Sequence, residues 1–117
     1  MKQDIAIKLA PLASATFQQK YMVNGTVAEY LIPEDILNDA YDCVRLARDF
    51  PEERTGLTPF ERSALLELEP FLDAIQSNEP TTNEELIRSP VWQQARVKTL
   101  GTIGVLGFNL NELEKRI

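Results

Sequence analysis

Four aspartates are spaced so that they share one side of a helix. Asp35, Asp39, Asp42 and Asp49 fall within roughly 80° of one another when successive residues are placed 100° apart. Clustered carboxylates can act as general acids and bases or can hold Mg²⁺. Either chemistry needs a pocket, and these four lie opposite the apolar face of the same helix, where solvent normally is. We therefore expect the aspartates to bind a partner rather than to catalyse a reaction.

An apolar residue stands within this acidic face. Leu46 projects to the same side as Asp39 and Asp42, with Asp49 beyond it. A leucine ringed by carboxylates can anchor a partner inside a charged rim, although single exposed leucines are common. The predicted partner-binding residues, which we call the acidic stripe, are Asp35, Asp39, Asp42, Leu46 and Asp49. The alternative is that the stripe is only a solvated outer helix face.

Histidine is absent from the chain, and cysteine occurs once, as Cys43. Without histidine, Ser–His and Cys–His nucleophilic systems and the usual near-neutral general base are excluded. The common zinc sites are excluded too, because a single Cys cannot supply their ligands. A lone cysteine on an apolar helix face is typical of the core of a protein from a reducing compartment. We therefore predict a cytoplasmic protein that is not an enzyme and has no cofactor and no metal site.

Acidic residues outnumber basic ones by eighteen to twelve, which gives a net charge of −6. The summed field repels nucleic-acid phosphates and anionic lipids, and the basic residues are scattered rather than clustered. No segment approaches the roughly 18 uninterrupted apolar residues of a membrane span. We expect no nucleic-acid or membrane partner. A basic protein is the more natural partner.

Three glycines recur at a spacing of three, at Gly101, Gly104 and Gly107. The spacing matches neither the dinucleotide-binding nor the phosphate-binding glycine motif, and no predicted strand precedes it. Close helix packing, with Gly107 ending a helix, explains the pattern better than phosphate binding. No cofactor is therefore predicted from the glycines.

The clearest predicted element is a helix from Pro33 to Asp49. Pro33 suits the first helical turn, the acidic residues after it favour the positive end of the helix dipole, and Pro51 ends it. One apolar face recurs along it at helical spacing. Its members are Ile36, Leu37, Ala40, Cys43, Val44 and Ala47.

A second helix begins after Thr58, which is a good N-cap followed by Pro59. The segment 51–56 before it is predicted to be a polar loop. The apolar pattern continues to Ile75 through Pro70, so the proline kinks the helix or splits it in two, and we expect a kink.

Further helices are predicted over 84–88 and from Pro90 onward, where Ser89 is the N-cap. The glycines weaken the later part of this second helix, and Gly107 ends it. Asn109 with Glu112 resembles a capping box for a last short helix.

The first thirty-two residues are ambiguous. Asn24-Gly25 suits the turn of a short β-hairpin near residues 20–32, but the flanking stretches lack clean alternation, and helices on either side of the turn are favoured. The fold class that we predict is all-α, an irregular bundle of about five to six helices in a single domain over residues 1–117.

In size and charge the chain resembles immunity proteins and antitoxins that neutralise nuclease toxins, whose phosphate-binding surfaces are often positive. The leading hypothesis is a non-enzymatic inhibitor of this kind, which binds a basic partner such as a toxin domain. The alternative is a structural or regulatory subunit that forms a homodimer through an apolar helix face near the glycines. The candidate residues for that face are Ile103, Val105, Leu106 and Phe108.

Overall fold

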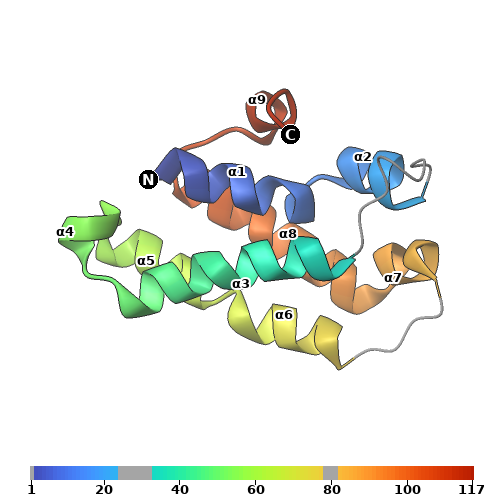
Figure 1. Ribbon diagram of the computed structural model, residues 1–117, viewed down its shortest axis with the longest axis horizontal. Helices are drawn as coiled ribbons and strands as arrows, with labels where there is room; N and C mark the ends of the chain where they lie inside the picture. Colours follow the sequence, from blue (N-terminus) through green and yellow to red (C-terminus); the bar gives the residue numbers. More distant parts are fainter. Residues whose placement is uncertain (1, 24–32, 78–81) are drawn as a thin grey trace.

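The computed structural model of the protein describes residues 2–23, 33–77 and 82–117. Within these ranges the chain is helical and contains no β-strand, which confirms the all-α prediction (Figure 1). The helices are more numerous and shorter than the five or six expected. They are α1 (Lys2–Ala13), α2 (Ala15–Gln18), the π-helical turn η1 (Gln19–Val23), α3 (Pro33–Asp49), α4 (Glu52–Thr55), α5 (Pro59–Leu66), α6 (Glu69–Gln76), α7 (Asn83–Arg88), α8 (Pro90–Val105) and α9 (Leu110–Glu114).

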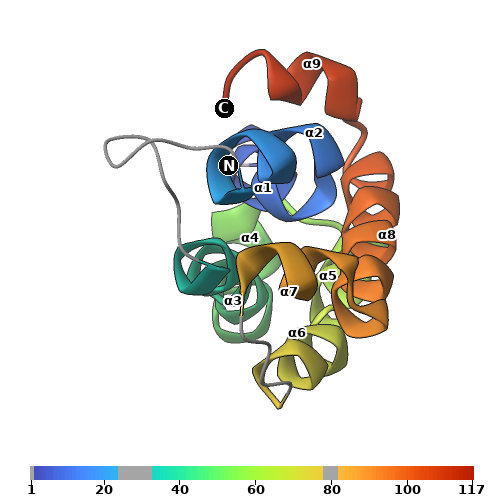
Figure 2. The same ribbon diagram turned by 90° about the vertical axis from the view of Figure 1, so that its right-hand side faces the viewer.

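Helix α1 is the central element of the bundle. It packs against α3 and against α8, and α9, near the carboxyl end of the chain, crosses over it (Figures 1 and 2). Three of its buried residues are alanines, Ala6, Ala10 and Ala13. Small side chains of this kind let neighbouring helices approach closely on more than one side. The remaining helices are therefore arranged around a thin, apolar helix.

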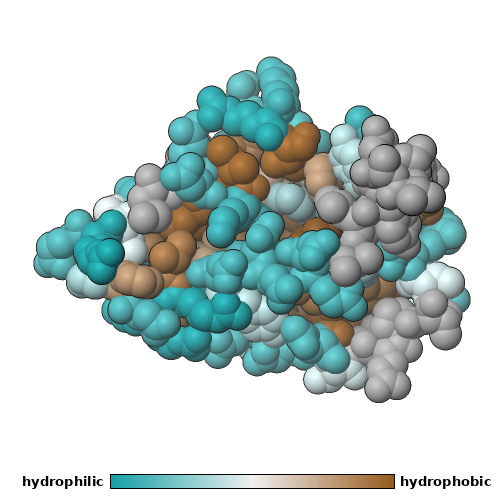
Figure 3. All heavy atoms as spheres, in the orientation of Figure 1, coloured by the Kyte–Doolittle hydropathy of each residue, from teal (hydrophilic) through white to brown (hydrophobic). Residues whose placement is uncertain are grey.

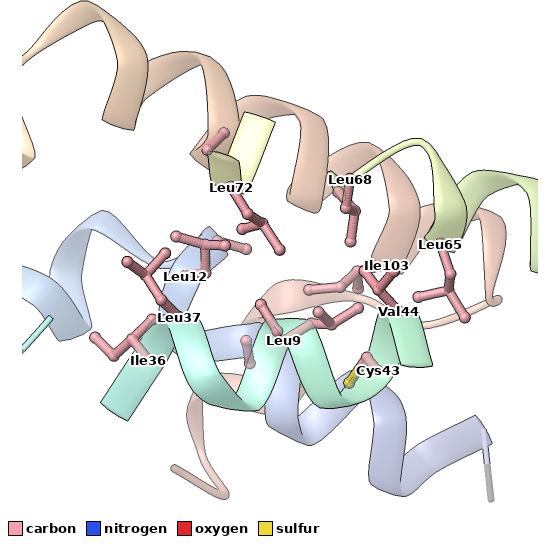
Figure 4. Close-up of a cluster of buried hydrophobic side chains, with 14 of the residues drawn as sticks. Leu9, Leu12, Ile36, Leu37, Cys43, Val44, Leu65, Leu68, Leu72 and Ile103 are labelled. Atoms are coloured by element: carbon pink, nitrogen blue, oxygen red, sulfur yellow. The ribbon is translucent and has the colours of Figure 1, made fainter. Parts of the chain in front are cut away.

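The core is formed by leucine, isoleucine and valine side chains that converge from several helices (Figure 4). Leu9 and Leu12 come from α1, and Leu37 and Val44 come from the apolar face of α3. Leu65, Leu68, Leu72 and Ile103 complete the cluster in the same view. No helix that the structure describes is both long and apolar enough to cross a membrane.

Helix α3 begins and ends at the predicted residues, Pro33 and Asp49. Its predicted apolar face is buried throughout. The carboxyl end of α3 is held by Arg62, whose guanidinium donates hydrogen bonds to the carbonyls of Ala47 and Arg48. A cation at this position also complements the negative end of the helix dipole.

The loop prediction for residues 51–56 is wrong, because residues Glu52–Thr55 form the short helix α4. Two glutamates at its start favour the positive end of a helix, and this local preference outweighs the turn signals. Gly56 ends α4 in the left-handed region, at φ 73°. Glycine adopts this conformation without a steric cost.

The kink expected at Pro70 is a complete break. Helix α5 ends at Leu66, the chain turns at Glu67 and Leu68, and α6 begins at Glu69. Proline has no N–H for the carbonyl four residues earlier, and its ring crowds that carbonyl. Pro70 therefore lies in the first turn of α6, where the missing donor costs nothing.

The β-hairpin prediction is wrong for the part of it that the structure describes. Residues 20–23, which would form its first strand, belong to the π-helical turn η1 that continues α2. The Asn24-Gly25 turn and the second strand lie outside the described residues. The helical alternative is thus confirmed up to Val23.

Helix α8 continues through Gly101 and Gly104 to Val105, and Gly107 follows it at φ 91°. Glycine in a helix interior is about 1 kcal/mol less favourable than alanine. A Cβ atom placed on Gly101 or Gly104 would nevertheless meet nothing within 4 Å. The packing of the described chain therefore does not require glycine at either position.

The caps predicted at Ser89 and Asn109 are present, with one difference, and Thr82 is a further cap that was not predicted from the sequence. Thr82, Ser89 and Asn109 each accept a hydrogen bond from a backbone N–H in the first turn. The side chain of Asn109 bonds the N–H of Asn111, at 2.8 Å, rather than that of Glu112. Asn109 is therefore an N-cap, but the capping box predicted with Glu112 is not formed.

A buried glutamine joins the end of α1 to α8. The side-chain amide of Gln18 donates to the carbonyls of Pro11 and Leu12, at 2.9 and 2.7 Å, and its oxygen accepts from Trp92 Nε1 at 3.0 Å. Carbonyls in the last turn of a helix lack partners within the helix. The Gln18 amide provides hydrogen-bond donors for two of these carbonyls, and its oxygen accepts from the indole N–H of Trp92, which is fully buried.

Replacing Gln18 with leucine is expected to lower the free energy of unfolding by about 3 to 5 kcal/mol, because it leaves the Trp92 N–H and two carbonyls without partners. Urea unfolding followed by circular dichroism measures the change. The same replacement at Gln19, which is exposed, is the control and is expected to cost no more than about 0.5 kcal/mol. Equal losses in the two variants would contradict this role.

A capping box starts α5 and is tied to α1. Thr58 Oγ1 accepts from the Glu61 N–H at 3.2 Å, and Glu61 Oε1 accepts from the Thr58 N–H at 2.8 Å. Lys2 Nζ lies 2.9 Å from the same carboxylate oxygen. Burial raises the pKa of Glu61, but the hydrogen bonds from Thr58 and the Lys2 ammonium outweigh it and hold this pKa below its usual range.

Acid is therefore expected to destabilise the protein partly through Glu61. Below about pH 5 the unfolded chain begins to protonate this carboxyl while the folded chain still holds it ionised, so stability is lost as the pH falls through the folded pKa. The variant Glu61→Gln is expected to lose less stability than the wild type over this range. Lys2→Met should flatten the profile in the same direction. Urea unfolding at a series of pH values tests this, and an unchanged slope in Glu61→Gln would contradict it.

Candidate functional site

The acidic stripe lies on the outer side of α3, away from the apolar face that packs in the core. Figure 3 shows the surface over α3 as mainly hydrophilic. The five predicted residues share one helix, but the structure gives them different surroundings. The amino-terminal and carboxyl-terminal halves of the stripe differ in whether their carboxylates form ion pairs with other described residues.

The amino-terminal half carries two carboxylates without an internal partner. Asp35 is exposed and Asp39 is half-exposed one turn later. Neither side chain makes a hydrogen bond or an ion pair with another described residue. Two carboxylates at this spacing are neighbours on a helix surface and repel each other. Both charges thus remain available to a cation from outside.

The carboxyl-terminal half is paired within the chain. Asp42 lies 2.8 Å from an Arg45 guanidinium nitrogen and 3.8 Å from Lys8 Nζ on α1. Asp49 lies 3.6 Å from Arg48 Nε, and Arg48 in turn lies 2.9 Å from Glu69 on α6. These pairs are exposed, so each stabilises the fold by less than about 1 kcal/mol. They do, however, neutralise much of the charge at this end of the stripe.

Leu46, predicted as an anchor for a partner, is less exposed than its place on the helix suggests. Its side chain is half-buried and packs against the hydrophobic core. One turn earlier on the same face, Asp42 is approached by Lys8 from α1, which packs against α3. Leu46 therefore stabilises the contact of α3 with the core and offers little surface to a partner.

A polar groove of about 480 Å³ lies between α3 and α6, next to the stripe. Tyr41 Oη donates a hydrogen bond of 2.6 Å to Asp73 Oδ1 across it. Partial burial, followed by this hydrogen bond and the charge of Asp73, raises the pKa of Tyr41. The phenol therefore keeps its proton at neutral pH and cannot serve as a base.

The single thiol is similarly unreactive. Cys43 is completely buried on α3, and its thiol lies 3.7 Å from the carbonyl of Ile5. Burial, with a smaller contribution from Asp39 and Asp42, raises the pKa of Cys43 to about 12. A protonated, inaccessible thiol is a poor nucleophile. Among the described residues no group of three or more His, Cys, Asp or Glu side chains is arranged to hold a metal ion.

Sequence reasoning missed the residues that pair with the stripe. The Asp42–Arg45 pair has a sequence signal, because residues three apart are neighbours on a helix. The contacts of Lys8 with Asp42 and of Glu69 with Arg48 have none, since they join helices that are distant in the chain. Only the packing of α1 and α6 against α3 creates them.

No protein-family model, curated protein or solved structure matches this chain. The site is thus described by its geometry alone.

Shortening Leu46 to alanine is expected to lower the free energy of unfolding by about 1 to 2 kcal/mol, less than at a fully buried site, because its side chain is only partly buried against the core. The change Asp39→Ala, on the same face, removes a side chain without an internal partner and is expected to cost at most about 0.5 kcal/mol. Urea unfolding of both variants gives the comparison. A Leu46→Ala variant as stable as the wild type would restore the anchor interpretation.

Proposed function

We propose that this chain is a small acidic binding protein, not an enzyme, that inhibits a basic protein partner. Its binding surface is the amino-terminal half of α3. The observation that carries the proposal is the pair of carboxylates Asp35 and Asp39, which lie one turn apart and have no counter-ion among the residues that the structure describes. A carboxylate already paired within the chain gains little from a second cation, whereas these two can each form a new charge-assisted bond.

The electrostatics of the whole chain support the same partner. A net charge of −6 attracts a basic surface at long range and accelerates encounter. Within the stripe, Asp42 extends the acidic surface beyond Asp39, although Arg45 and Lys8 share its charge. A nuclease toxin domain fits this description, because it needs a positive surface to bind phosphates. The partner would thus meet carboxylates at the place where it otherwise binds nucleic acid.

Reversing the two unpaired charges tests the proposal. The double variant Asp35→Lys/Asp39→Lys is expected to weaken binding to the basic partner by about 100-fold or more, because two attractive contacts become repulsive. The partner to be tried first is a purified nuclease domain encoded beside this gene, with calorimetry for affinity and nuclease activity for inhibition. The milder variant Asp35→Asn/Asp39→Asn should weaken binding less and leaves the helix less perturbed.

The matched control is Glu52→Lys/Glu53→Lys on α4. These glutamates are also exposed, and the double change alters the net charge of the chain by the same amount at the other end of α3 (Figure 1). Binding within about threefold of the wild type is expected for the control. Equal losses in the two reversed variants would mean that overall charge, not this surface, attracts the partner. That result, or no inhibition of any basic nuclease, would overturn the proposal.

A further inference from the structure

An apolar groove of about 440 Å³ lies between α5 and α8. Its lining is mainly apolar or small, with Phe60 and Ala64 from α5 and Val97, Gly101 and Val105 from α8. Figure 2 shows α3 and α8 at opposite sides of the molecule. The groove is therefore separate from the acidic stripe, and the function proposed for the stripe leaves it unexplained.

The side chains around this groove are unusually exposed for their type. Phe60 and Val97, which line it, are 72% and 57% exposed, and Leu100, which follows Val97 on α8 outside the lining, is 38% exposed. Within the described ranges, the other large hydrophobic side chain that is exposed is Phe50, at 37%, on the connection between α3 and α4. Apolar side chains exposed singly are ordinary, whereas a gathered set marks an interaction surface.

None of the fully exposed positions of helix α8 is charged, although Arg96 and Lys98 are partly exposed. Its exposed positions are Pro90, Gln94, Val97, Leu100, Gly101 and Gly104. By contrast, five of the six exposed positions of α3 are charged. Charged residues make up 26% of the chain, so a helix whose fully exposed positions are all uncharged differs from the average surface of this protein. Depletion of charge is typical of the centre of a protein interface.

The charges at the rim of the groove balance each other. Glu67 and Lys98 line it, and their charged atoms lie 2.7 Å apart. Two copies of a chain with a net charge of −6 repel each other over most of their surface. They do not repel at this face, where the local charge sums to zero. Under a two-fold axis, Lys98 of each copy can also face Glu67 of the other.

The two glycines of α8 become explicable if a second backbone approaches them. Gly101 and Gly104 lie on the exposed face, and neither is needed for packing within the described chain. A helix surface without side chains lets another helix come close, which a larger residue would prevent. Gly101 lines the apolar groove, and Gly104 follows it on the exposed face of α8, so both can lie under the backbone of a partner helix.

We infer that the α5/α8 face binds a second copy of this chain and forms a two-fold homodimer. The face is self-complementary, because it carries both a projecting aromatic ring, Phe60, and a groove floored by Gly101 and Ala64. In an isologous interface each copy inserts its projection into the groove of the other. This replaces the face predicted from the sequence, since Ile103 and Leu106 are buried in the core and only Val105 lines the groove.

The homodimer would present two acidic stripes at once. Because α3 lies on the side of the molecule away from α8, association through α8 leaves both α3 surfaces exposed (Figure 2). The inference does not depend on the proposed function. Salt dependence distinguishes homodimer formation from binding to a basic partner. Added salt screens the repulsion between two acidic copies, whereas it weakens the attraction to a basic partner.

Sedimentation equilibrium over a wide range of protein concentration tests the dimer. The wild type is expected to dimerise, with a dissociation constant that stays level or falls as salt is added. Phe60→Glu is expected to raise this constant by about tenfold or more, because it places a charge in the apolar interface. Gly101→Gln is expected to do the same by filling the floor of the groove. Both positions are exposed, so circular dichroism should show the folded helix content in both variants.

The control is Phe50→Glu, which also replaces an exposed phenylalanine but lies outside the groove. It is expected to leave the dissociation constant within about twofold of the wild type. A wild type that stays monomeric at every concentration overturns the inference, whether or not another protein covers the groove. A dimer that persists unchanged in both Phe60→Glu and Gly101→Gln overturns it as well, because the interface then lies elsewhere.

Discussion

The fold depends on the burial of α1 among its neighbours. An apolar helix with alanines on its buried surface can be covered by α3, α8 and α9, but its last carbonyls must then find partners away from water. Gln18 provides two of those partners from the following turn and takes the Trp92 N–H in return. One polar side chain thus allows both the end of a central helix and the largest side chain of the core to be buried without an unsatisfied group.

This arrangement also divides the surface into two unlike sides. Covering α1 with α3 and α8 directs the outer face of α3 to one side of the molecule and that of α8 to the other (Figure 2). The first carries carboxylates, two of them unpaired among the described residues, and the second carries exposed apolar side chains and glycines beside a single Glu67–Lys98 ion pair. Because the two surfaces differ in the physical basis of binding, electrostatic in one and hydrophobic in the other, they suit partners of different kinds.

Much of the helical architecture was predictable because its signals are local. The bounds of α3, the Thr58 cap and the left-handed Gly107 each depend on residues within a turn or two of the position. The misses have local causes of a different kind. In residues 51–56 a weak helix preference competed with turn signals, and the segment forms a helix. At Pro70 the sequence pattern permitted either a kink or a break in the helix, and the structure has a break. In residues 20–23, by contrast, apolar and polar residues alternate too poorly for a strand, which favoured the helical structure that is observed.

The sequence by itself determined which residues share a face of α3, because helical periodicity alone brings Asp35, Asp39, Asp42, Leu46 and Asp49 to one side. It also determined the net charge and the absence of histidine. Only the tertiary structure decided what each residue of that face does. Lys8 and Glu69 come from other helices to pair with Asp42 and Arg48, and Leu46 packs against the hydrophobic core. Contacts between helices distant in the chain leave no periodic signal, so packing alone distinguishes a free carboxylate from a paired one.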